Sequence, residues 1–159
     1  MALAGRGSLI VTNAPGTGTL DIRRGTLIFN GGNIVVDQLL LTNGGSGVIT
    51  FNSGTLISRG TAVSNFKNFV IGDTGSGGAT FVANGGSHGF GNELAVGNTS
   101  VGNALVISNG AVLVNSSSYV GRMASSSSNS VLVSGADSQW RNQGLLTIGR
   151  GGDGNALTI

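Results

Sequence analysis

The sequence predicts an all-β fold, a right-handed single-stranded parallel β-helix (β-solenoid) with three short strands in each coil and about six coils. Two observations predict it. Three short apolar sequence motifs, here called words, recur in a fixed order about every 24–30 residues. Glycine or asparagine separates one word from the next. The 159 residues include 30 glycines, yet 39% are hydrophobic, which is enough to fill a narrow aliphatic core. We expect one domain over residues 1–159.

The first word of each coil is a short apolar strand that ends in a polar or glycine turn. Its copies are Leu9–Asn13, Leu39–Asn43, Phe69–Asp73, Leu94–Asn98, Ser118–Arg122 and Leu146–Arg150. If these copies are equivalent, Val11, Leu41, Ile71 and Val96 lie directly above one another along the solenoid axis. The fold prediction depends on that stacking.

Two further words follow in each coil. Copies of the second are Gly18–Ile22, Gly47–Phe51, Gly78–Val82, Asn103–Ile107, Asn129–Val133 and Asn155–Ile159. Copies of the third are Gly25–Phe29, Gly54–Ser58, Gly110–Val114 and a weaker Gly135–Gln139, with a degenerate Gly85–Phe90 in the third coil. Each strand turns alternate side chains inward, and a single coil can bury them only by stacking on another. An antiparallel sandwich also has short strands, but it has no reason to repeat three words in order.

The turns favour the same architecture. Asn and Gly tolerate the left-handed backbone angles that sharp corners need, and stacked amides hydrogen-bond from coil to coil. We therefore predict a ladder of side chains at the end of the first word, formed by Asn13, Asn43, Asp73 and Asn98. Asn84 and Asn109, each followed by glycine, mark a second corner.

Apolar residues also occupy positions that this word alignment turns outward. They are Phe81, Val106 and Leu132 on the second word, and Ile28, Ile57 and Leu113 on the third. An exposed apolar stripe marks a contact surface, so we expect the chain to associate laterally or end to end with itself or with neighbouring solenoid coils. Neither end shows a capping element, which predicts a fragment of a longer solenoid or a subunit that stacks.

No catalytic, cofactor or metal site is expected. A glycan-active β-helix needs paired acids, but the six acids fall in different words of different coils: Asp21, Asp37, Asp73, Glu93, Asp137 and Asp153. The single histidine, His88, lies in a glycine-rich stretch and is expected to be exposed, and without cysteine it cannot complete a metal site. A glycan-active enzyme using Asp73 or Asp153 stays the disfavoured alternative.

Charge and hydropathy exclude two classes of partner. The net charge is +2 and the basic residues are scattered, so no nucleic-acid partner is expected. No run of about 18 apolar residues occurs, so no membrane insertion is expected.

The C-terminal stretch, Val131–Trp140 continuing into Gly144–Ile159, resembles the repeats of bacterial autotransporter-type passenger domains and of surface proteins with autotransporter-associated β-strand repeats. The resemblance covers about Leu9 to Ile159. It implies a right-handed parallel β-helix on an extracellular or outer-membrane-associated bacterial surface, acting as a stalk or adhesin that contacts a glycan or host surface. A self-assembling extracellular filament subunit is the alternative.

Overall fold

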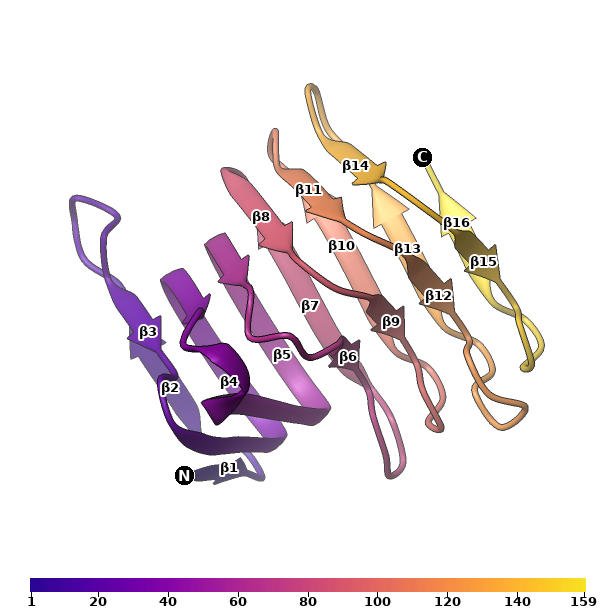
Figure 1. The fold of residues 1–159 in the computed structure, drawn as a ribbon, viewed down its shortest axis with the longest axis horizontal. Helices are drawn as coiled ribbons and strands as arrows, with labels where there is room; N and C mark the ends of the chain where they lie inside the picture. The colour runs from indigo at the N-terminus through magenta and orange to yellow at the C-terminus, as the bar shows by residue number, and fades with distance from the viewer.

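The computed structural model describes residues 1–159 and confirms the predicted β-solenoid. Sixteen strands form one sheet whose pairs are all parallel, and the chain winds through about six turns. Its only helical segment is the 3-10 turn η1, Gly44–Ser46. Figure 1 shows the coils following one another along the long axis of the molecule.

Three ladders of stacked strands form the walls of the solenoid. Ladder A contains β1 (Ala2–Ala4), the start of β4 (Gly25–Leu41), the start of β5 (Gly47–Val63), β6 (Phe69–Ile71), β9 (Leu94–Val96), β12 (Ser118–Val120) and β15 (Leu146–Ile148). Ladder B contains β2 (Ser8–Val11), the middle of β4 and β5, β7 (Ala79–Asn84), β10 (Ala104–Ser108), β13 (Ser130–Val133) and β16 (Ala156–Thr158). Ladder C contains β3 (Thr19–Asp21), the ends of β4 and β5, β8 (Ser87–Phe90), β11 (Val112–Asn115) and β14 (Gln139–Asn142).

The ladders form two layers. In Figure 1 the strands of ladders C and A run one after the other in the nearer layer, and β7, β10 and β13 of ladder B pass behind them. The space between the layers holds a core of 25 buried hydrophobic residues. Phenylalanine fills part of this core: Phe29 stacks on Phe51 with ring centroids 4.9 Å apart, and Phe69 contacts both Phe81 and Phe90.

The expected stacking of the first word is correct in the C-terminal coils and wrong in the N-terminal ones. Ile71 pairs with Val96 in ladder A as predicted. Val11, however, pairs with Val36 in ladder B, and Leu41 pairs with Val63 in ladder C. The coil from β4 to β5 is shorter than the spacing between these copies of the first word, since Phe29 pairs directly with Phe51. Copies of the first word that are 30 residues apart are therefore separated by more than one full coil, and they lie in different ladders.

The other two words are displaced for the same reason. Residues 25–29 and 47–51 both lie in ladder A and pair with each other, whereas residues 54–58 lie in ladder B. The Gly18–Ile22 copy contributes β3 to ladder C. The Gly85–Phe90 stretch, expected to be degenerate, contains a regular strand, β8, that pairs with both β5 and β11.

Glycine allows β4 and β5 to turn a corner without leaving the sheet. Each strand has 17 residues and runs through all three ladders. At the corner in β4, Gly31 and Gly32 have φ angles of 124° and 81°. A Cβ atom on Gly32 would lie 2.0 Å from the carbonyl oxygen of Gly7 in the coil beneath, so no other residue fits.

In the later coils a loop forms the corner between ladder A and ladder B, and asparagine side chains stabilise it. Asn103, Asn129 and Asn155 lie above one another there. The Nδ2 of Asn103 donates to Oδ1 of Asn129 (2.8 Å), and that of Asn129 donates to Oδ1 of Asn155 (2.9 Å). Each Oδ1 also accepts a backbone N–H from the coil before it. We call these three residues the asparagine ladder.

The ladder predicted from the sequence is therefore only partly correct. Asn98 donates to Oδ1 of Asp73 at 2.7 Å, as expected for residues of adjacent coils. Asn13 instead bonds to Thr17 within its own loop, and Asn43 donates to the carbonyl of Arg23. These two are wrong because they end strands of ladders B and C. The second corner is confirmed, since Asn109 donates to Asn84.

Candidate interaction surface

The acidic side chains brace turns and neighbouring coils. The buried Asp37 accepts the backbone N–H groups of Asn13 and Gly18 on Oδ2, at 2.9 and 3.0 Å. Glu93 pairs with Arg122 at 2.6 Å across adjacent coils. No three His, Cys, Asp or Glu side chains gather into a group. Asp73 and Asp153, the acids considered for an enzyme, lie in turns about three coils apart, which is roughly 14 Å along the stack.

The histidine is buried, and the expectation of an exposed imidazole is wrong. His88 lies on β8 with 1% of its surface exposed, because β8 is a regular strand that turns it inward against Phe81. Nε2 hydrogen-bonds to the carbonyl of Gly85 (2.8 Å), and Nδ1 contacts Oγ1 of Thr61 (3.0 Å). Burial lowers the pKa of His88, partly opposed by the Gly85 bond. The imidazole is therefore neutral at pH 7, with Nε2 donating and Nδ1 accepting.

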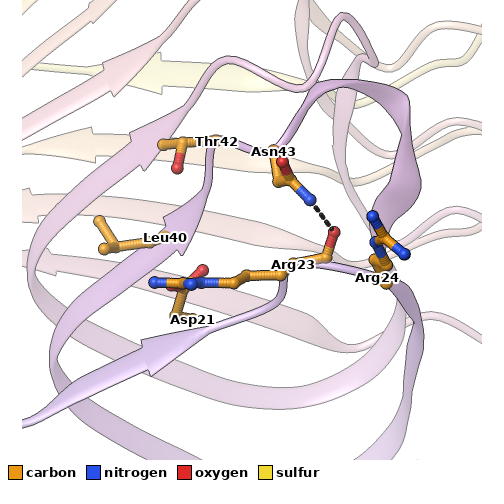
Figure 2. A pocket seen from close by; sticks show the side chains of 6 residues that line it. All are labelled: Asp21, Arg23, Arg24, Leu40, Thr42 and Asn43. Carbon is orange, nitrogen blue, oxygen red and sulfur yellow. Dashed lines mark hydrogen bonds and ion pairs between the residues drawn. The ribbon is translucent and has the colours of Figure 1, made fainter.

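The largest hollow lies on the outer side of the first coils, and its side chains do not converge. It has a volume of about 590 Å³ and is lined by Asp21, Arg23, Arg24, Leu40, Thr42 and Asn43. Nε of Arg23 donates to Oδ2 of Asp21 at 2.6 Å, and this hydrogen bond raises the pKa of Arg23. Figure 2 shows the two guanidinium groups pointing in different directions, with only that of Arg23 reaching the carboxylate. The pair of arginines therefore does not form a clamp for a single anion.

The outer surface of ladder B is the most regular feature of the exterior. The residue that points outward from the middle of each ladder B strand pairs with its equivalent in the next coil, which places seven side chains in one line: Ile10, Val35, Ile57, Val82, Val106, Leu132 and Thr158. We call the first six the aliphatic rank and this surface the lateral face. Ile10 is 66% exposed and Leu132 39%, while the four between them are half-buried by their neighbours.

A rank of small and polar residues runs beside the aliphatic rank. Its members are Ser8, Asn33, Thr55, Thr80, Ala104, Ser130 and Ala156. None of the ladder B segments in either rank contains a charged residue. The other two outer surfaces differ. Ladder C carries Asp21 and Arg141, and on ladder A the guanidinium groups of Arg122 and Arg150 each lie 5.3 Å from the Tyr119 ring.

The structure brings together three of the six predicted association residues. Ile57, Val106 and Leu132 all belong to the aliphatic rank. Ile28 is exposed but lies on ladder A. Phe81 is wholly buried, because it pairs with the inward Leu105.

The sixth predicted residue, Leu113, is also wholly buried, because it pairs with the inward His88. The errors at Phe81 and Leu113 are one-residue slips in alignment, and such a slip exchanges the two faces of a strand. The slip at Phe81 also hid Val82, whereas Val35 lies between two predicted words and was covered by neither. Counting outward from the inward pair Leu105 and Ile107 along each strand pairing would have found them.

No protein-family model, curated protein or solved structure matches this chain. None of its helical segments is long and apolar enough to cross a bilayer. The fold and surface therefore define the class by themselves: a parallel β-solenoid with one uncharged, aliphatic outer face.

Proposed function

We propose that the chain is a non-enzymatic structural or adhesive β-solenoid module of a bacterial surface or secreted protein. The observation that supports this most is the lateral face, an outer surface with an aliphatic side chain in six successive strands and no charge. A monomer with no contact to make has no reason to keep such a stripe in water.

The use of buried polar groups also supports a structural role. The asparagine ladder bonds one coil to the next, and Ser100 and Ser126 bond to backbone carbonyls of the preceding coil. His88 is enclosed, so no solute can reach its ring nitrogens. In an enzyme, by contrast, perturbed titratable groups line an accessible cleft.

The extracellular, bacterial setting is part of the proposal and comes from the resemblance of residues 131–140 and 144–159 to autotransporter-type repeats. Such repeats build long stalks by stacking coils, and the stacked coils of this chain have the geometry that a stalk requires.

The proposal is tested by an assay for glycan turnover. The purified chain is incubated with uronic-acid polymers, neutral glycans and peptidoglycan, and the release of reducing ends or unsaturated products is measured. We expect no turnover. Turnover that disappears in Asp73→Asn or Asp153→Asn, both of which lie in turns outside the core, would replace the structural role with an enzymatic one.

A further inference from the structure

We propose that the lateral face binds the lateral face of a second copy of this chain, forming a reversible two-fold dimer. This inference rests on the proposed structural function and deepens it, because it names the partner and the surface.

The spacing of the face favours a copy of itself. Strands in a ladder lie about 4.8 Å apart, so the six side chains of the aliphatic rank form ridges at that interval over roughly 24 Å. A partner that fits must present ridges at the same interval. Two such ranks can be related by a two-fold axis that lies in the plane between the two faces and is perpendicular to the ranks. With an offset of half an interval, each side chain lies between two of the other copy.

The chemistry of the face excludes the other usual partners. It has no aromatic side chain on which a sugar ring could stack, since the outward positions carry aliphatic, small, hydroxyl or amide side chains. Its strands have no basic residue to attract a nucleic acid or an anionic lipid. Two uncharged faces bring no like charges together, whereas pairing through ladder A would place Arg122 and Arg150 against their own copies.

The small area of the face indicates weak association. A face of seven strands, each about five residues long, covers roughly 500 Å² per copy, or roughly 1,000 Å² in total. That is near the lower limit for a specific interface, so we expect a dissociation constant on the order of 10–100 µM. The dimer would then form mainly where copies are concentrated, as on a crowded surface.

The experiment is sedimentation equilibrium of the full chain from about 5 µM to 1 mM, comparing wild type with two matched variants. Val106→Lys places an ammonium group in the centre of the aliphatic rank. Val114→Lys is the control: it makes the same change in the same coil, at a half-buried outward position on ladder C. We expect Val106→Lys to weaken association at least about tenfold and Val114→Lys to leave it unchanged. Circular dichroism must show that both variants are folded.

Should Val106→Lys fail to fold, Val106→Thr keeps the shape and strand propensity and is expected to weaken the dimer by a smaller factor. A wild-type chain that stays monomeric at 1 mM overturns the proposal. So does a dimer that both lysine variants leave intact, or one that only Val114→Lys disrupts. A monomer whose Val106→Lys variant alone loses binding to zwitterionic vesicles or insoluble polysaccharide would assign the face to another partner. None of these outcomes depends on glycan turnover, so the proposed function fails or holds separately.

Discussion

The N-terminal coils and the C-terminal coils build the same stack with different corners. Between Gly25 and Val63, the chain turns within the long strands β4 and β5, and their corners are backbone packed on backbone at Gly31, Gly32 and Gly54. From Phe69 onward the strands have three to six residues, and loops join them. Those loops are fixed by side chains, chiefly by the asparagine ladder. A solenoid can therefore form its corners in two ways: with glycines that let backbone pack on backbone, or with loops that side-chain hydrogen bonds hold in place.

The two kinds of corner share one requirement, which is a glycine at a positive φ packed against a neighbouring coil. At Gly72, which has a φ of 76°, an added Cβ would lie 2.0 Å from Oδ1 of Asn103, so the asparagine packs directly on the glycine. Gly97 and Gly121 hold Asn129 and Asn155 in the same way. A Cβ atom added at Gly72 would meet a side chain, which can move, whereas one added at Gly32 would meet backbone, which cannot. This difference gives the order of the expected effects below.

The largest effect is expected from Gly32→Ala. The new Cβ would meet the carbonyl of Gly7, and alanine would also have to adopt a φ of 81°. We expect a loss of at least about 4 kcal/mol in the free energy of unfolding, or no folded protein. Gly25→Ala is the control, because Gly25 has a similar φ of 83° but nothing within 4 Å of the added atom; strain alone should cost about 1 kcal/mol. Urea titration measures both, and equal losses would show that crowding at the corner is unimportant.

The next largest effect is expected from Asn129→Ala. The buried Asn129 accepts the backbone N–H and the amide of Asn103, and it donates to Ser126 and Asn155. Removing it leaves buried donors without partners, so we expect a loss of about 3 kcal/mol. Asn84→Ala, which removes a surface amide pair with Asn109, should cost less than about 1 kcal/mol. Thermal and urea unfolding measure the stability of both variants. Similar losses in the free energy of unfolding would show that the asparagine ladder is not especially important.

A smaller effect, dependent on pH, is expected at His88, where the two regions meet through its contact with Thr61 of β5. Its pKa is lowered by burial, while in the unfolded chain it is about 6.5. As the pH falls below about 6.5, the unfolded chain binds a proton that the folded chain does not, so stability falls by up to about 1.4 kcal/mol per pH unit. Well above pH 7 neither the folded nor the unfolded chain binds this proton, so the group contributes no slope there.

His88→Gln supplies the control for that measurement, since glutamine keeps a donor and an acceptor but does not titrate. Unfolding midpoints followed from pH 7.5 to 5 should fall more steeply in the wild type than in the variant. Parallel curves would mean that the buried imidazole is not responsible for the acid sensitivity of the chain.

The comparison also explains what the sequence could predict. The fold class followed from recurring strand words, and the predicted stacking was correct at Ile71, Val96 and Asn103, where loops separate the strands. In β4 and β5 the corners lie inside continuous strands, so no turn signal marks residues such as Val36, with which Val11 pairs, and words from different ladders look alike. Val11 and Leu41 were misplaced for that reason.

The residues of the lateral face could not be predicted from the sequence repeat alone. Whether a residue faces in or out changes with a slip of one position, and the short words did not fix that position at Phe81 or Leu113. Only the pairing of each strand with the next reveals that Val35, Val82 and Val106 share a line. His88 was misjudged because glycine-rich flanks resemble a loop even when they border a strand.

The smallest effects are expected from removing ion pairs, and the expected loss of stability differs between the two regions. In the N-terminal region Arg23 is largely exposed beside Asp21, so solvent screens the pair, and Asp21→Asn should leave the unfolding midpoint unchanged within error. In the C-terminal region the side chains of Glu93 and Arg122 are 17% and 24% exposed and join two coils. Glu93→Gln should therefore lower stability by about 1 kcal/mol, less in 1 M salt. Thermal unfolding of both variants at low and high salt makes the measurement, and equal sensitivity to salt would mean that burial between coils does not strengthen the second pair.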